Sequence, residues 1–248
     1  MRYYDEISAY LGRTYDKELS APWDHDGEMV FCDLEIHRVL VALDATTPAI
    51  KYARRHGCDL IITHHPLLFK SPYPIDVVKR YIMLKKCGIG LLSYHTRLDE
   101  ADGGVNDCLC KALGFVDFKR MGGCGRIAET EPMTTQQLSM LVEGALGVHP
   151  FVVDSGRTIH RVGIVSGAGK DEIIKAKYAY GCDAFITGEA NHSSFIAAHE
   201  IGITLVCATH HATERVVLPA LAKTLRDEFV DDLEIMVFDF NEDIEYGV

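Results

Sequence analysis

The chain has 248 residues, 48% of them hydrophobic and 25% charged, which is typical of globular domains. This length suffices for one large domain or two modest ones with substantial cores. A net charge of −11 argues against a protein that wraps nucleic acid or lies on an anionic membrane. The sequence has no apolar signal region and no bilayer-long apolar run, and its eight cysteines are scattered without Cys-x-x-Cys spacing. We therefore expect a cytoplasmic protein with free thiols and no membrane partner.

Apolar runs of strand length alternate with amphipathic stretches of helix length in the first half of the chain. The expected strands cover residues 39–43, 59–63 and 89–94, and the expected helices cover 47–56 and 76–87. This alternation predicts an α/β fold with mostly parallel sheets flanked by helices.

The second half repeats this order. The expected strands cover residues 162–166, 183–187 and 203–208, and the expected helices cover 171–180 and 193–200. The heptapeptide GCDLIIT at 57–63 also matches GCDAFIT at 181–187 in five of seven positions. We interpret the chain as two related, internally duplicated α/β units. Both copies place polar residues just after a strand, where open α/β sheets bind their ligands.

A glycine-rich stretch at 121–125 marks the expected boundary between the units. The first unit would then cover residues 1–121 and the second 122–214. A capping box at Thr134 and Gln137 predicts a helix early in the second unit. Residues 215–248 are expected to form a C-terminal helix and a final strand at 234–240. This C-terminal segment could fold back onto the first unit.

Metal-binding residue types gather after four of the expected strands. They are His64 and His65, then His95 and Asp99, then Glu189 and His192, and finally His210, His211 and Glu214. Two of these groups have the form His-x-x-x-carboxylate, and we place them at equivalent positions of the two copies. In a helix this spacing puts both side chains on one face.

Imidazole and carboxylate ligands together suit zinc, iron, manganese, cobalt or nickel better than calcium or magnesium. A single histidine at a strand end is usually structural, so the repeated pattern carries the metal interpretation. His64 and His65 are adjacent, and neighbouring side chains of an extended strand face opposite ways. The pair therefore favours two ions bridged by a carboxylate over one ion.

Two other motifs give weaker signals. The stretch GAGK at 167–170 follows a strand and precedes a helix but lacks the spacing of a Walker loop, so we interpret it as a tight turn. The stretch WDHDG at 23–27 is an expected loop, and its pattern predicts no role.

Four motifs carry a resemblance to a known family. They are IITHHP at 61–66, YHTRLD at 94–99, ITGE at 186–189 and HHATE at 210–214. The chain resembles the Nif-three-like proteins, also called GTP cyclohydrolase 1 type 2 homologues, over nearly its whole length and in their short form. The resemblance implies two related α/β domains and a ring-shaped homohexamer.

The resemblance also implies a dinuclear centre with two divalent metal ions per chain. The ligands it implies are His64, His65, Asp99, His210 and Glu214, with Glu214 bridging. His95 is the expected catalytic acid or base. Further residues expected to support the site or contact substrate are Glu189, His192, His211 and Arg97. Arg97 departs from the small or polar residue usual in the family, and it either favours an anionic substrate or pairs with a surface carboxylate.

The expected activity is that of a metal-dependent hydrolase, in which a metal-bound water attacks a small, nucleotide-like substrate. By family name the reaction is hydrolytic opening of the GTP imidazole ring at C8. Two alternatives remain open: a metal-dependent phosphoesterase, and a non-enzymatic scaffold for metal binding or trafficking.

Overall fold

The computed structural model describes residues 2–33, 35–68 and 74–239. The chain forms two compact units, Met1–Ala101 with Leu218–Val248 and Asp102–Val217. Each unit has a sheet flanked by helices, so the predicted α/β class is confirmed. Within the described ranges, no helix combines the length and apolar character needed to cross a bilayer.

The first unit contains a five-stranded sheet. Its strands, in spatial order, are β13 (Glu234–Phe238), β4 (Arg38–Ala42), β5 (Leu60–Thr63), β6 (Gly90–Ser93) and β2 (Gly27–Val30). The first four are parallel, and β2 runs antiparallel to β6 at one edge. A separate two-stranded ladder joins β1 (Arg2–Tyr3) to β3 (Glu35–Ile36).

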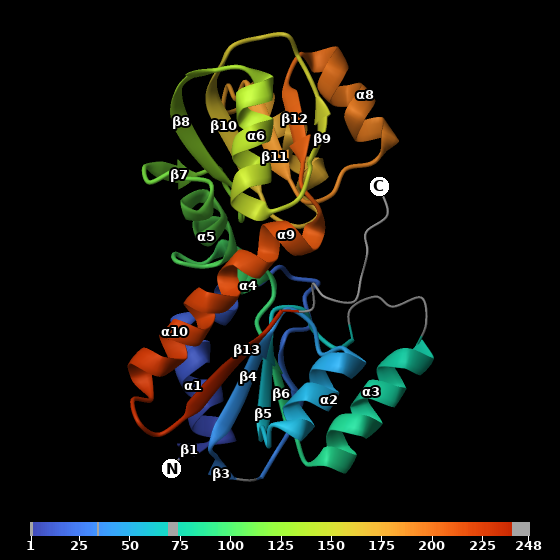
Figure 1. The fold of residues 1–248 in the computed structure, drawn as a ribbon, viewed down its shortest axis with the longest axis vertical. Coiled ribbons are helices and arrows are strands. Elements are labelled where there is room, and N and C mark those ends of the chain that lie inside the picture. The colour runs from blue at the N-terminus through green and yellow to red at the C-terminus, as the bar shows by residue number, and fades with distance from the viewer. Residues whose placement is uncertain (1, 34, 69–73, 240–248) are drawn as a thin grey trace. The chain divides into compact units, whose positions relative to one another are not determined.

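Helices cover both faces of this sheet. In Figure 1, α2 (Thr47–Arg55) and α3 (Pro74–Cys87) lie on one side, and α1 (Tyr4–Thr14) and α10 (Leu218–Glu228) lie on the other. Ile61 of β5 packs in one core with Ile50 of α2 and Leu84 of α3. Because both faces are covered, β5 and β6 are buried along their whole length, which explains their near-continuous apolar sequences.

The second unit contains a six-stranded sheet. Its strands, in spatial order, are β7 (Phe118–Arg120), β8 (Arg126–Met133), β10 (Ile159–Val165), β11 (Ala184–Thr187), β12 (Thr204–Cys207) and β9 (Phe151–Val153). The central three are parallel, whereas β7, β8 and β9 pair antiparallel with their neighbours. This sheet is therefore more mixed than the mostly parallel one expected.

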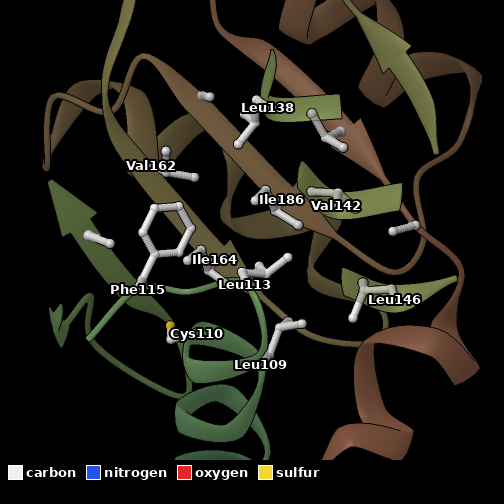
Figure 2. Close-up of a cluster of buried hydrophobic side chains, with 14 of the residues drawn as sticks. Leu109, Cys110, Leu113, Phe115, Leu138, Val142, Leu146, Val162, Ile164 and Ile186 are labelled. Carbon is white, nitrogen blue, oxygen red and sulfur yellow. The ribbon is translucent and has the colours of Figure 1, made fainter. Parts of the chain in front are cut away.

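Two apolar cores lie on the two faces of this second sheet. On one face, residues of α5 (Val105–Ala112) and α6 (Thr135–Leu146) pack against Ile164 and Ile186 (Figure 2). On the other, α7 (Ile173–Tyr178) and α8 (His192–Ile201) pack against Phe185. Ile186 and Phe185 are neighbours in β11 and face opposite cores, as the alternation of a strand requires.

The division of the chain differs from the one expected at residues 121–125. Residues 102–121 fold with the second unit because Leu109 and Cys110 of α5 lie in its core. The glycine-rich stretch is the turn between β7 and β8, in which the Met121 N–H donates to the Gly125 carbonyl at 2.8 Å. The C-terminal strand β13 pairs with β4, and Phe240, included in the expected strand, lies outside the described residues.

The two units share a strand arrangement that positions the candidate site. In the first, Thr63 at the end of β5 pairs with Ser93 at the end of β6. In the second, Thr187 at the end of β11 pairs with Cys207 at the end of β12. The polar residues that follow these strands therefore gather at the carboxyl edge of each sheet.

Candidate metal centre

Three histidines of the first unit meet at the carboxyl edge of its sheet. His64 and His65 follow β5, and His95 follows β6. One ring nitrogen from each lies within 4.8 Å of the others. Asp99, on the short helix α4 (Thr96–Glu100), places Oδ1 at 3.6 Å from Nε2 of His64. The structure thus brings together all four first-unit residues that the sequence marks as ligands or catalytic groups.

Each of these imidazoles is held at Nδ1 by an oxygen acceptor. The acceptors are the Tyr94 carbonyl for His64 at 3.0 Å, the Asp44 carboxylate for His65 at 3.0 Å and the Asp24 carboxylate for His95 at 3.1 Å. These oxygens only accept hydrogen bonds, so each ring carries its proton at Nδ1. The neutral ring then has its lone pair at Nε2, which is how metal-binding histidines are usually oriented.

Asp24 lies in the loop at 23–27, and its side chain is 1% exposed. Besides His95, it accepts hydrogen bonds from the Thr96 N–H at 2.9 Å and the Thr96 hydroxyl at 2.6 Å. Burial by itself raises the pKa of Asp24, but the hydrogen bonds from His95 and Thr96 outweigh it and hold the pKa below the ordinary 3.8. The carboxylate is therefore charged and fixes the orientation of the His95 ring.

Arg97 is buried and bound to Asp26 of the same loop. Its Nε and Nη2 lie 2.8 and 2.9 Å from the two carboxylate oxygens, and Nη1 donates to the Tyr15 carbonyl at 3.2 Å. The guanidinium carbon also lies 4.7 Å from the centre of the Tyr94 ring. Of the two interpretations of Arg97, pairing with a carboxylate is the one that the structure favours. The partner is buried, however, and not on the surface as expected.

In the second unit, His210 and Glu214 belong to the short helix α9 (His210–Glu214). Nε2 of His210 is 2.9 Å from Oε1 of Glu214, and Nδ1 is 2.8 Å from Oε1 of Glu189, which follows β11. Glu214 is 3% exposed, whereas the side chain of Glu189 is 53% exposed. The i, i+4 spacing therefore brings an imidazole and a buried carboxylate together, with a second carboxylate orienting the ring.

The backbone beside this pair leaves room for it. Gly167 follows β10 with a φ of +56°, and an added Cβ would collide with the Glu214 carboxylate and lie 3.1 Å from Nε2 of His210. The stretch at 167–170 is a tight turn, as the sequence predicts, and continues into the 3₁₀ helix η2 (Gly169–Glu172). The glycine at 167 therefore lets the turn lie against His210 and Glu214.

The two His-x-x-x-carboxylate motifs do not occupy equivalent positions, contrary to the expectation from sequence. Both helices begin three residues after the last residue of their strand, α4 after Ser93 and α9 after Cys207. His95 precedes the first residue of α4, whereas His210 is the first residue of α9. The second motif is therefore shifted by one residue.

The gathered histidine and carboxylate side chains are of the kinds that could hold a metal ion. At ligand distances near 2.1 Å, two atoms bound to one ion lie about 3 Å apart. The 2.9 Å between His210 and Glu214 and the 3.6 Å between His64 and Asp99 are compatible with shared coordination. The donor set of imidazole and carboxylate, and the glycine beside it in the second unit, support the same conclusion.

The two remaining candidate residues, His192 and His211, are not fully buried. His192 lies exposed on the first turn of α8, and His211 is half-buried on α9. Sequence reasoning missed Asp24 and Asp44, although two carboxylates separated by one residue in the WDHDG loop were a signal for Asp24. Asp44 stands two residues after the end of β4, as His65 does after β5.

Comparisons with known proteins identify the family of the chain. The model of the Duf34/NIF3 (NGG1p interacting factor 3) family matches residues 2–244. A GTP cyclohydrolase 1 type 2 homolog of Clostridium perfringens is 34% identical over 219 residues, which are 82% of each chain. One from Methanocaldococcus jannaschii is 30% identical over 244 residues, 95% of this chain and 98% of that one.

Solved structures give the same result. The protein ybgI, described as of unknown function, superposes with a TM-score of 0.88 at 26% identity, covering 96% of this chain and 98% of that one. Reduced HcgD from Methanocaldococcus jannaschii has a TM-score of 0.82 at 29% identity, with the same coverage. A Bacillus cereus protein related to NIF3 shares the fold, with a TM-score of 0.89 at 19% identity over 100% of this chain and 99% of that one. The chain belongs to the Duf34/NIF3 family.

Proposed function

We propose that this protein binds two divalent metal ions per chain and uses them to hydrolyse a small, nucleotide-like molecule. The proposed ligands are His64, His65 and Asp99 from the first unit and His210 and Glu214 from the second. The observation that carries the proposal is the shared orientation of the histidines. His64, His65 and His210 each have Nδ1 against an oxygen acceptor, so Nε2 is the nitrogen that each would offer to a metal.

The role proposed for His95 follows from its contact with Asp24. With the proton held at Nδ1, Nε2 of His95 accepts a proton from an attacking water, and the Asp24 carboxylate stabilises the resulting imidazolium. A divalent ion held by the proposed ligands would supply the Lewis acidity that activates the attacking water. The same histidine then returns its proton to the leaving group.

The relatives supply the first substrate to test. Those from Clostridium perfringens and Methanocaldococcus jannaschii are both named GTP cyclohydrolase 1 type 2 homolog. Hydrolytic opening of the GTP imidazole ring, with release of formate, is therefore the first reaction to examine. The family name indicates a substrate class more weakly than the ligand set indicates a metal.

Metal content tests the binding proposal directly. Elemental analysis of protein purified without added metal should give about two ions per chain. The bridging role that the resemblance implies for Glu214 predicts that Glu214→Gln loses both. His149→Ala is the matched control because that side chain is 74% exposed, and it should keep both ions. One ion or none in the wild type would contradict the dinuclear proposal.

Turnover tests the hydrolase proposal separately. Metal-loaded protein is incubated with GTP and with a panel of phosphoesters, and formate and phosphate are measured. His95→Ala should keep its metal and lose about 10²–10⁴-fold in rate, the usual contribution of a general acid or base. Phosphate release without formate would favour the phosphoesterase. Tight metal binding without turnover on any substrate would favour the alternative of a non-enzymatic metal-binding scaffold.

The resemblance also implies a homohexamer, and a measurement of the mass of the protein in solution tests it.

A further inference from the structure

We propose that Thr209 is a positioning residue whose left-handed backbone directs His210 and Glu214 to the metal. This inference rests on the proposed metal binding and adds the backbone conformation that orients the proposed ligands of the second unit. Thr209 is the second of the two residues between β12 and α9, and it is the N-cap of α9.

The backbone of Thr209 has an unusual conformation. Its φ is +63° and its ψ is 146°. This region is essentially restricted to glycine, and a β-branched side chain is especially unfavourable there. Among the described non-glycine residues, only Thr209 and Asp231 have a positive φ, and aspartate tolerates such a turn far better than threonine.

Three hydrogen bonds hold this conformation. The Thr209 hydroxyl accepts from the Ala212 N–H at 3.3 Å and so caps α9. The Thr209 carbonyl accepts from the N–H and the hydroxyl of Thr213, at 3.3 and 3.0 Å. Thr213 in turn accepts from the Gly167 N–H at 3.0 Å, which ties the start of α9 to the turn beside the ligands. Strain that is held by several contacts at a site of function is typical of a conformation that the function requires.

The first unit shows where the two copies diverge. After β6, the Tyr94 N–H donates to the Thr63 carbonyl at 2.9 Å. After β12, the Ala208 N–H donates to the Thr187 carbonyl at the same 2.9 Å. The two segments therefore leave their sheets in the same register, up to and including Tyr94 and Ala208.

The next residue changes the direction of the chain. His95 has a φ of −98°, whereas Thr209 has a φ of +63°. In the first unit, His95 itself and Asp99 face the gathered histidines. In the second unit, the pair that comes together is one residue later, at His210 and Glu214. The positive φ at Thr209 accompanies this shift, and without it the poorly ligating Thr209 and Thr213 would take the places of His95 and Asp99.

Two substitutions separate backbone conformation from the hydroxyl group. Thr209→Gly removes the hydroxyl but adopts a positive φ freely, so it should bind Co²⁺ within about threefold of wild type, because glycine also serves well at helix N-termini. The metal-free variant should be at least as stable to urea as wild type, because the strain is gone. Thr209→Val keeps the branched side chain without the hydroxyl, and it should bind Co²⁺ at least about tenfold more weakly.

The readouts are chelator competition for Co²⁺ affinity, the visible absorption bands of bound Co²⁺, and urea unfolding without metal. Thr134→Gly is the matched control because Thr134 also caps a helix of this unit, at an ordinary φ of −85°. It should lose stability and keep its Co²⁺ affinity and spectrum. If Thr209→Val does not fold, Thr209→Ala replaces it, because alanine also keeps a Cβ and lacks the hydroxyl.

The outcomes distinguish this inference from the proposed function. Wild-type protein that binds no Co²⁺, or His210→Ala that binds it normally, would remove the metal site and the inference with it. If His210→Ala loses Co²⁺, the positioning role is tested alone. It is overturned if Thr209→Gly binds tenfold more weakly or is less stable, or if Thr209→Val and Thr209→Ala match wild type.

Discussion

The buried pair of Arg97 and Asp26 leads to a prediction about stability. Arg97→Met removes the cation and keeps an apolar stem of similar length, leaving the fully buried Asp26 carboxylate without its main partner. Breaking a buried ion pair by removing one partner costs about 3–5 kcal/mol. Lys17 still contacts Asp26 Oδ1 at 2.5 Å, so we expect a loss near the lower end, about 3 kcal/mol.

Urea unfolding of the wild type and variants measures this loss. Lys17→Met is the control because that side chain is 57% exposed, and it should lower the free energy of unfolding by less than about 1 kcal/mol. The double variant Asp26→Asn, Arg97→Met removes both charges and should recover part of the loss, since no buried charge is left. A loss below about 1 kcal/mol for Arg97→Met, or a double variant no more stable than the single one, would refute the reasoning.

Three further predictions concern the residues around the metal ligands. Folding lowers the pKa of Asp24 below 3.8, so its charge stabilises the fold fully above that pH and this stabilisation is lost as the pH falls. Asp24→Asn should therefore lower the free energy of unfolding by about 1–3 kcal/mol at pH 7, and the difference from wild type in urea titrations should narrow below about pH 4. Gly167→Ala should weaken metal binding in chelator competition, because its Cβ would displace Glu214 and its φ is positive, and an unchanged affinity would contradict the placement of the turn. Glu189→Gln should lower metal affinity about 10–100-fold with an unchanged circular dichroism spectrum, since the exposed carboxylate acts by orienting His210. Wild-type affinity in that variant would show that His210 needs no such partner.

The central strands of both sheets were predictable because burial on two faces leaves a plain signal. LIIT of β5 and AFIT of β11 are apolar, and the repeat between them exposed the duplication. The residues that follow β5 and β6 could also be identified, because ligand types after parallel strands converge at one edge. The antiparallel strands β7, β8 and β9 were missed because they are short or carry many polar side chains.

The contacts and backbone angles that orient the site residues were less predictable. Sequence spacing set His95 equivalent to His210, because a one-residue shift leaves the His-x-x-x-carboxylate pattern intact. The structure reveals the shift, because His95 precedes α4 whereas His210 begins α9, and threonine gives no sign of the positive φ that accompanies it. Asp24 was missed because it contacts His95 from 71 residues away in the sequence, and the paired carboxylates of its loop do not show which residue they contact.

The pairing of β13 with β4 has a consequence for the order in which the protein folds during synthesis. The second unit lies wholly between Ala101 and Leu218, so the ribosome completes it before the last strand of the first unit is made. Until Glu234–Phe238 emerges, the apolar strand β4 has an unpaired edge. Exposed strand edges promote association with other chains, and domains generally fold as units in the order of their synthesis. The nascent first unit should therefore depend on chaperones for longer than the second, although its sequence begins first.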